Sequence, residues 1–313
     1  MYESFFAAAR VVIPMALLML TGVLCRKGNI INRADMKKYD NVVFRIFMPM
    51  LLFKNIYEAE LSGNINAGEF ILTAVSLTVI FFLTLIFIPK IIKDGNKAAV
   101  ISQATVRGNY ILFGIAVSEG LYGEGNSGAV AILGTLVVPM INILSAIILE
   151  LNRSGKARPL KLITAILKNP MIIGALSAFA LKLLNIYIPV PIWSAIRSIA
   201  NSTTTVSFIS LGVGLDMSET RYDLKPLMLA IFLRMIVVPL VFLNISIFLG
   251  FRGQVLCALM VVFAAPTAVA SYPMAVAMGA DGNLAGQIVC ATTLLSILTI
   301  FLWTFALMSL GML

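Results

Sequence analysis

The chain of 313 residues contains no histidine and only three cysteines. Without histidine, the chain lacks the commonest metal ligand and the usual general base near neutral pH. The cysteines lie far apart in apolar segments with neither a zinc-type nor a CxxC spacing, so we interpret Cys25, Cys257 and Cys290 as small apolar residues. No P-loop of the form GxxxxGKS or GxxxxGKT is present, which excludes the use of ATP by this chain. We therefore expect no metal and no cofactor.

Charge is also scarce, because charged residues make up 12% of the chain and apolar residues 60%. Soluble domains contain about 25% charged and about 45–50% apolar residues. This imbalance excludes a soluble enzyme, a nucleic-acid-binding protein and a secreted disulfide scaffold, and it predicts a polytopic membrane protein. The formal net charge of +9 then reflects basic loops that contact anionic lipid headgroups, not a nucleic-acid partner.

Ten apolar segments approach the length of about 20 residues that a membrane-spanning helix requires. The sequence thus predicts an all-α membrane protein with spanning helices over Phe5–Cys25, Asn41–Tyr57, Phe70–Ile92, Ala98–Leu121, Gly128–Leu149, Pro170–Leu184, Pro191–Leu215, Lys225–Leu249, Val255–Met278 and Leu284–Leu310. A short basic stretch, residues 152–169, separates five segments within residues 1–151 from five within residues 170–313.

Lysine and arginine are distributed unevenly among the connections between these segments. The connections after the first, third and fifth segments contain thirteen of them, whereas those after the second and fourth contain only Lys54 beside several glutamates. The positive-inside rule places the first group in the cytoplasm. We therefore expect an integral protein of the plasma (inner) membrane, with both termini outside and residues 152–169 as a cytoplasmic loop.

The two halves of the chain resemble each other weakly. Residues 14–30 and 170–186 share five identities in 17 positions at an offset of 156, and the pair Gly125-Asn126 recurs as Gly282-Asn283 at an offset of 157. Because each half contains an odd number of spanning segments, the second copy is expected to be inverted relative to the first. Inverted repeats of this kind are typical of secondary transporters.

Residues that disturb helices occur in the fourth and ninth segments, and they coincide when the offset of 157 is applied. Asn109 then falls on Pro266, and Gly114 falls on Ser271. Proline lacks an N–H group and clashes with the preceding turn, so a helix breaks there. We predict interruptions at Asn109, Gly114, Pro266 and Pro273. The half-helices that follow begin with unpaired N–H groups, which attract anions such as carboxylates.

Polar residues beside these interruptions are the candidates for substrate binding. They are Gln103, Arg107, Gly108, Asn109, Pro266, Thr267, Ser271 and Tyr272. Arg107 either neutralises an anionic substrate or has a structural role, in which it pairs with an acidic residue or reaches the cytoplasmic surface. The same question arises for Arg45 and Arg234, for which the structural role is favoured.

Coupling to protons requires carboxylates in a chain without histidine. The candidates are Glu119 and Asp216, although capping of a helix or pairing with Arg221 is the simpler role for Asp216. The coupling ion, H⁺ or Na⁺, stays open.

Several short motifs point to a known family. Residues 47–53 read FMPMLLF, residues 107–110 read RGNY before Phe113-Gly114, and Ala265-Pro266 precedes Tyr272-Pro273. Together with the ten-segment layout, these motifs resemble the auxin efflux carrier family in its short prokaryotic form, over nearly the whole chain. The chain departs from the family pattern at Ala116, where a proline often follows the glycine, and it lacks the long central hydrophilic loop of many plant members.

The resemblance implies a scaffold domain and a transport domain, with broken fourth and ninth helices that cross at Asn109 and Pro266. It also implies a homodimer. The substrates that it implies are organic anions, namely auxin in plants and malate, malonate or similar carboxylates in bacteria.

These observations favour a secondary transporter that moves a small organic anion by alternating access. The alternative is a sodium-coupled carrier of the bile-acid symporter type, which has a similar inverted plan and is distinguished by sodium dependence. An enzyme is disfavoured because the sequence offers neither a metal cluster nor a clear pair of embedded catalytic carboxylates. A receptor without transport activity would leave the paired interruptions without a purpose.

Overall fold

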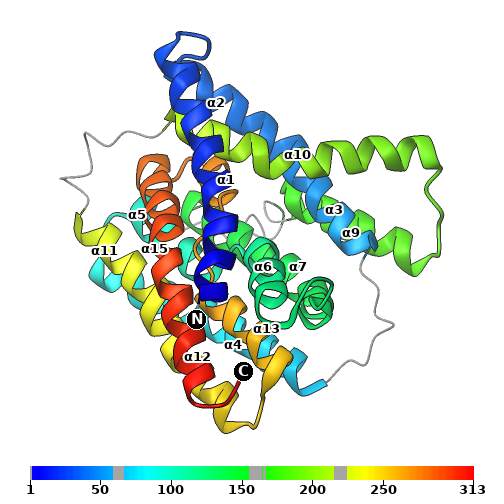
Figure 1. Ribbon diagram of the computed structural model, residues 1–313. Helices are drawn as coiled ribbons and strands as arrows, with labels where there is room; N and C mark the ends of the chain where they lie inside the picture. Colours follow the sequence, from blue (N-terminus) through cyan, green and yellow to red (C-terminus); the bar gives the residue numbers. More distant parts are fainter. Residues whose placement is uncertain (1, 59–66, 155–163, 165–166, 215–223) are drawn as a thin grey trace.

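The computed structural model describes residues 2–58, 67–154, 164, 167–214 and 224–313. Within these ranges all regular structure is helical (Figure 1). The one β-type pairing in the same ranges is an isolated bridge between Gly108 and Thr267. The expected all-α class is therefore confirmed for the described residues.

The first half of the chain contains a continuous rod and an interrupted helix. Its helices, in chain order, are α1 (Tyr2–Lys27), α2 (Arg33–Val42), the π-helical η1 (Val43–Phe47), α3 (Met48–Glu58), α4 (Ala67–Ile91), α5 (Gly95–Val106), α6 (Tyr110–Tyr122) and α7 (Gly128–Ser154). The rod is formed by α2, η1 and α3, which follow one another without a gap. The interrupted helix is formed by α5 and α6, which are separated by residues 107–109.

The second half also contains a rod and an interrupted helix. Its helices are α9 (Pro170–Leu183), α10 (Val190–Gly214), α11 (Leu224–Phe232), the π-helical η3 (Leu233–Val237), α12 (Val238–Phe248), α13 (Gly253–Ala264), α14 (Ser271–Ala277) and α15 (Gly282–Ser309). Here α11, η3 and α12 form the rod, and residues 265–270 interrupt the helix between α13 and α14.

The second predicted segment starts too late. It was expected to begin at Asn41, but the helix begins at Arg33, eight residues earlier. Hydropathy excludes this polar stretch from a spanning segment, although Met36 and Asp40 within it are buried against other helices. Hydropathy therefore marks the apolar part of a helix and not its start.

Asparagine and aspartate explain several helix boundaries. The side chains of Asp94, Asn169 and Asp281 each accept a hydrogen bond of 2.9 Å from a backbone N–H in the first turn of α5, α9 and α15, respectively. Such N-caps satisfy donors that have no partner within the helix. Beyond the ends of α1 and α9, Asn29 and Asn185 adopt positive φ angles of 55° and 51°, a conformation that asparagine tolerates better than most residues.

The helices gather in two groups (Figure 1). We call the first group the arm; it consists of α2, η1, α3, α9 and α10 and extends to the right in the figure. We call the second group the body; it consists of α4 to α7 and α11 to α15. Helix α1 lies between the groups, because it packs against α10 of the arm and against α6 and α15 of the body.

Helices α1 and α10 approach each other closely where each contributes a glycine. A Cβ atom at Gly22 would lie 2.1 Å from the carbonyl oxygen of Ile209, and one at Gly212 would lie 2.0 Å from the carbonyl oxygen of Met19. Small residues let membrane helices pack backbone to backbone. This contact fixes α1 to the arm.

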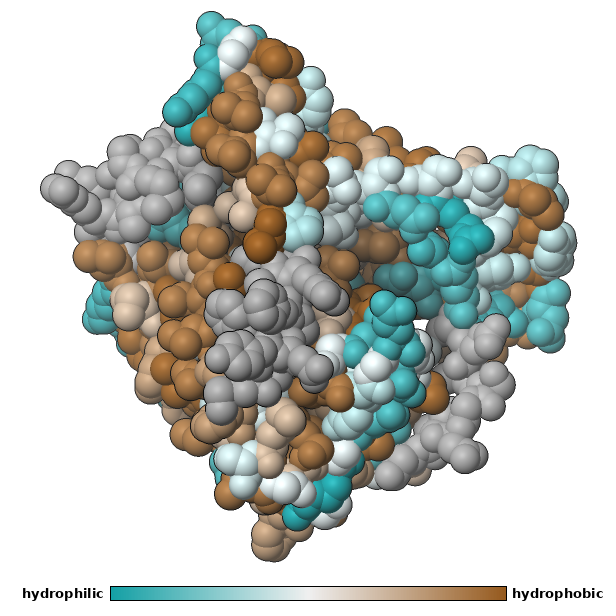
Figure 2. All heavy atoms as spheres, in the orientation of Figure 1, coloured by the Kyte–Doolittle hydropathy of each residue, from teal (hydrophilic) through white to brown (hydrophobic). Residues whose placement is uncertain are grey.

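Four described helices or rods are long and apolar enough to cross a membrane, namely Ala67–Ile91, Gly128–Asn152, Leu224–Phe248 and Gly282–Ser309. Large apolar side chains on them, such as Phe82, Phe232 and Leu298, are about half exposed. The flank formed by α11, α12 and α15 is largely hydrophobic in Figure 2, whereas hydrophilic residues gather at the top, around the end of α1. Soluble proteins rarely expose apolar surface on this scale, so the flank is suited to lipid.

Candidate functional site

The two interrupted helices cross and pair through their backbones. The N–H of Asn109 donates to the carbonyl oxygen of Pro266 at 2.8 Å, and the N–H of Ala268 donates to that of Arg107 at 3.0 Å. Gly108 and Thr267 therefore face each other as an antiparallel bridge. The crossing brings together the ends of α5 and α13 and the beginnings of α6 and α14.

Proline and glycine account for the interruptions. Ala265 is extended, with φ −61° and ψ 146°, as expected for a residue that precedes a proline. Gly108 has no room for a side chain, because a Cβ atom there would lie 1.9 Å from Nη2 of Arg234. The crossing thus depends on Pro266, which ends α13, and on Gly108, which leaves room for the side chain of Arg234 at the end of α5.

Arg234 binds the ends of both interrupted helices. It lies in η3 with a fully buried side chain. Its Nε donates to Ala265 at 2.8 Å, its Nη1 to Thr105 at 3.1 Å and its Nη2 to Val262 at 3.0 Å, in each case to the carbonyl oxygen. Carbonyl groups at the end of a helix have no partner within it and carry a partial negative charge. Arg234 satisfies them at α5 and α13 together, so its role is structural, but through backbone carbonyl groups and not through an acidic partner or the membrane surface.

Replacing Gly108 by alanine should destabilise the crossing. Overpacking of this kind costs about 1–3 kcal/mol, and displacement of Arg234 would also leave carbonyl groups without donors. We expect a lower midpoint of thermal unfolding in detergent than for the wild type. The matched control is Gly128→Ala at the start of α7, where a Cβ atom meets nothing within 4 Å. Equal midpoints for the two variants would contradict the close packing at Gly108.

Arg107 is buried without a counter-charge among the described residues. Its side chain is 3% exposed. Nη2 donates to Oδ1 of Asn142 at 2.6 Å, and Nη1 lies 3.1 Å from Sδ of Met274. Nε has no hydrogen-bond partner, and no acidic residue among those described forms an ion pair with this guanidinium. The burial argues against a side chain that reaches the surface, and the neutral partners argue against a structural ion pair within the described residues.

Other polar groups around the interrupted helices also lack partners in the part of the chain that the structure describes. Buried side-chain atoms without a hydrogen-bond partner among the described residues include Nδ2 of Asn109, Oγ of Ser271 and both amide atoms of Gln103 and of Gln287. Buried polar groups are normally satisfied, so a concentration of exceptions indicates a place for a ligand or water. No motif in the sequence points to Gln287, which lies on α15.

Thr267 differs from these residues because its polar groups are occupied. Its N–H donates to Oγ1 of Thr292 at 3.2 Å, and its hydroxyl donates to the carbonyl oxygen of Ala104 at 3.2 Å. Thr267 therefore fastens the crossing to α5 and α15. The backbone of Pro266 is engaged in the same way, through its bond from Asn109.

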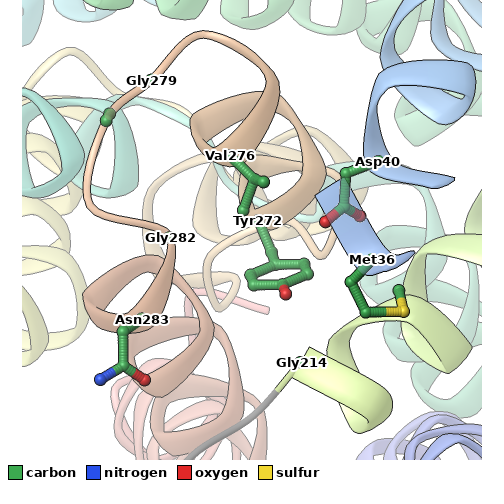
Figure 3. A pocket seen from close by; sticks show the side chains of 9 residues that line it. Met36, Asp40, Gly214, Tyr272, Val276, Gly279, Gly282 and Asn283 are labelled. Carbon is green, nitrogen blue, oxygen red and sulfur yellow. The ribbon is translucent and has the colours of Figure 1, made fainter. Parts of the chain in front are cut away.

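Tyr272 connects the crossing to a cavity between the arm and the body. This cavity has a volume of about 370 Å³ and is lined by Met36, Asp40, Gly214, Tyr272, Val276, Gly279, Ala280, Gly282 and Asn283. Figure 3 shows the side chains from α2 on one side and those from α14 on the other. A Cβ atom at Gly214 would lie 1.8 Å from the Tyr272 hydroxyl, so α10 also closes on this ring.

A second cavity, of about 530 Å³, lies beside the end of α14. Its lining includes Arg45, Glu150 and Lys168. Arg45 is exposed, so water can solvate its charge, in contrast to the buried charge of Arg107. The two cavities meet consecutive residues at the end of α14, because Gly279 lines the first and Met278 lines the second.

Two predicted interruptions are wrong. Gly114 lies inside the continuous helix α6, where its lack of a side chain makes room for Val130, whose Cγ1 would be 2.5 Å from a Cβ atom. Pro273 lies in the first turn of α14, where a missing N–H breaks no helical hydrogen bond. The interruptions are instead at residues 107–109 and 265–270.

Of the two predicted coupling acids, only Glu119 lies within the described residues, and it is remote from the crossing. Asp216 lies outside the described residues. Glu119 sits near the far end of α6, where Oε1 accepts hydrogen bonds of 3.3 Å from the N–H of Gly125 and from the hydroxyl of Ser127. It lies ten residues after Asn109, or about 15 Å along a helix. Glu119 therefore holds the loop after α6.

An apolar, all-helical chain with two crossed interrupted helices has the architecture of a membrane transporter. The family described as membrane transport protein matches residues 8–304. The chain belongs to this family, which is the auxin efflux carrier family, so the resemblance predicted from the sequence is confirmed. Members of this family are transporters and not enzymes.

Relatives and a solved structure agree with this membership. An uncharacterized transporter of Methanothermobacter thermautotrophicus is 22% identical over 96% of this chain and 98% of its own length. An uncharacterized transporter of Methanocaldococcus jannaschii is 26% identical over the same shares. The structure of a sodium proton antiporter from M. jannaschii matches with a TM-score of 0.58 and 13% identity over 96% of both chains, which shows similarity of fold alone.

Proposed function

We propose that this protein is a secondary transporter that carries a small organic anion, such as malate, malonate or an auxin-like acid, by alternating access. The observation that carries the proposal is the buried guanidinium of Arg107, whose described partners are neutral. A buried charge without a counter-charge is costly, and in a membrane protein it marks a functional site by default. A carboxylate at the crossing would supply the missing charge.

The surroundings of Arg107 suit an anion further. Helix α6 begins two residues beyond the bridge at Gly108, and its first N–H groups carry a partial positive charge. The amide of Asn109 and the hydroxyl of Ser271 are donors without acceptors in the described structure. A carboxylate has two oxygens that accept several hydrogen bonds, so it can satisfy these donors together with the guanidinium.

The proposal includes two inverted five-helix repeats, residues 1–151 and 170–313, joined by residues 152–169. The helix bounds support it, because α4 and the rod α11 to α12 are offset by 157 at both ends, and α5 and α13 by 158 at both ends. The turns after α1 and α9 support it too. Asn29 and Asn185 are 156 residues apart, and each donates its N–H to the carbonyl oxygen three residues earlier, that of Arg26 and of Lys182, respectively.

In this proposal the arm is the scaffold and the body is the moving transport bundle. The cavity of about 370 Å³ between them supports this division, because it separates α2 and α10 from α14 and α15. Arg45 and Lys168 at the second cavity would raise the local concentration of an anion beside the crossing. We also propose that the protein is a homodimer in the plasma membrane, with both termini outside.

The sodium-coupled alternative is less well supported by the crossing. In many carriers, unwound carbonyl groups and the C-terminal ends of half-helices coordinate the coupling cation. Here the carbonyl oxygens of Thr105, Val262 and Ala265 already accept hydrogen bonds from Arg234. A sodium ion at these oxygens would have to displace a tethered guanidinium, so we propose a carrier that works without sodium at this position.

The test is uptake into proteoliposomes of labelled malate, malonate and indole acetate, measured with and without a membrane potential. We expect saturable uptake of at least one acid by the wild type. Asn109→Ala should raise the half-saturation concentration by about tenfold or more, because a hydrogen bond to a charged group contributes about 1.5–3 kcal/mol.

The matched control is Asn244→Ala, which removes an exposed amide bonded only within its own helix. This variant should transport like the wild type. Failure of the folded wild type to move any of the acids would remove the proposed substrates. Uptake that requires sodium would favour the bile-acid symporter type instead.

A further inference from the structure

Asp40 is a buried carboxyl group that the transport site does not use. It lies on α2 with a relative exposure of 0%. The hydroxyl of Ser210 on α10 donates a hydrogen bond to Oδ1, whereas Oδ2 has no hydrogen-bond partner among the described residues. A carboxylate buried with one unsatisfied oxygen is costly, and the same group becomes tolerable when it binds a proton.

The position of Asp40 links it to the contact between the arm and the body. Figure 3 shows its carboxyl group at the cavity of about 370 Å³, with Tyr272 and Val276 of α14 on the opposite side. Helix α14 leads directly away from the crossing. Any movement of the body against the arm therefore changes how much water reaches Asp40.

No charged group among the described side chains pairs with Asp40. The charged and titratable groups on the elements packed against it or beside the cavity include, among the described residues, Arg26, Lys27, Asp35, Lys38, Tyr39, Arg45, Arg197, Tyr272 and Asp281. Arg26 donates to the carbonyl oxygen of Val213 at 3.1 Å, Asp35 pairs with Lys38 at 3.5 Å, and Asp281 caps α15. No ion pair with Asp40 occurs within the described residues.

The chemistry of the cavity favours a proton over a metal cation. Hard cations take about six oxygen ligands. The described lining offers side-chain oxygens only from Asp40, Tyr272 and Asn283, and the rest of it is glycine or apolar. One carboxyl oxygen is enough to bind a proton.

We propose that Asp40 is a proton-binding site that controls the contact between α2 and α14, and this rests on the proposed alternating access. The protonated, neutral carboxyl group is stable in the closed contact that the structure shows. The ionised group favours separation of the two helices, because separation lets water reach the free oxygen. A rise in pH on this side of the protein therefore opens the contact.

The test measures access to the cavity without requiring any substrate. The three native cysteines are replaced by alanine, Val276→Cys is introduced, and its labelling by N-ethylmaleimide in detergent is followed between pH 5 and pH 8. The same experiment with Asp40→Asn corrects for the reactivity of the thiol itself. One proton changes a population by at most about tenfold per pH unit. We therefore expect the labelling rate with Asp40 present, divided by the rate in Asp40→Asn, to rise at least about threefold from pH 5 to pH 8.

Two further variants separate titration from structural damage. Asp35→Asn, on the same helix, should show the same pH response as the Val276→Cys protein that keeps Asp40. Ser210→Ala removes a donor that stabilises the ionised carboxylate, so the midpoint of the pH response should move to higher pH. This shift decides the question if Asp40→Asn fails to fold.

A ratio that stays constant with pH overturns the proposal, as does an unchanged midpoint in Ser210→Ala. A response to sodium at fixed pH overturns it in favour of a metal cation. A pH response in labelling, in a protein that carries none of the acids, would leave this site in place and remove only the proposed substrates.

Discussion

Arg107→Gln should weaken the binding of carboxylates without destabilising the protein. The variant loses the charge that the substrate would neutralise, and hydrogen bonds to charged groups contribute about 1.5–3 kcal/mol, so the half-saturation concentration should rise about tenfold to a hundredfold. The folded protein loses a buried cation that has no described counter-charge. Its midpoint of thermal unfolding in detergent should therefore stay the same or rise.

The opposite directions of these two effects make the prediction specific. Removal of a structural arginine would lower the midpoint of unfolding. Removal of a substrate-binding arginine lowers the affinity for substrate but leaves the stability unchanged or higher. The control is Arg197→Gln, because this exposed arginine pairs with Glu58 at 3.1 Å and lies away from the crossing. Unchanged affinity with intact transport in Arg107→Gln would refute the substrate role.

The interruptions of the helices were predictable because their causes are local. Pro266 cannot continue a helix whatever surrounds it, and the offset between the halves pointed from Pro266 to Asn109. Gly114 shows the limit of this reasoning, since a glycine in a helix can serve a bend or a close contact. Only the position of Val130 decides between the two.

The functions of Arg234 and Asp40 depend on contacts that sequence does not display. The sequence shows Arg234 as a charge within an apolar segment, but its partners come from two other segments. Asp40 lies in a polar stretch that resembles a loop in the sequence, and its burial results from packing against α10 and α14. In both cases the sequence identifies the residue, but the groups that surround it come from segments that are distant in the sequence.

Arg234→Met should destabilise the protein strongly, in contrast to Arg107→Gln. The variant leaves the carbonyl oxygens of Thr105, Val262 and Ala265 buried without a donor, and each such group costs about 1–3 kcal/mol. A loss of even about 3 kcal/mol lowers the midpoint of thermal unfolding by about 6 °C or more. Uptake should fall as well, because the ends of α5 and α13 lose the group that holds them together.

The control for this prediction is Arg252→Gln. This arginine also donates to carbonyl oxygens at a helix end, those of Ile247 in the last turn of α12 and of Phe251 just beyond it, at 3.0 and 2.7 Å, but it is exposed. Water can replace its hydrogen bonds, so its removal should change the midpoint little. Arg234→Lys should fall between the two, since one ammonium group keeps the charge but lacks the planar fork that reaches three carbonyl groups. If Arg234→Met and Arg252→Gln unfold at the same temperature, Arg234 does not hold the crossing.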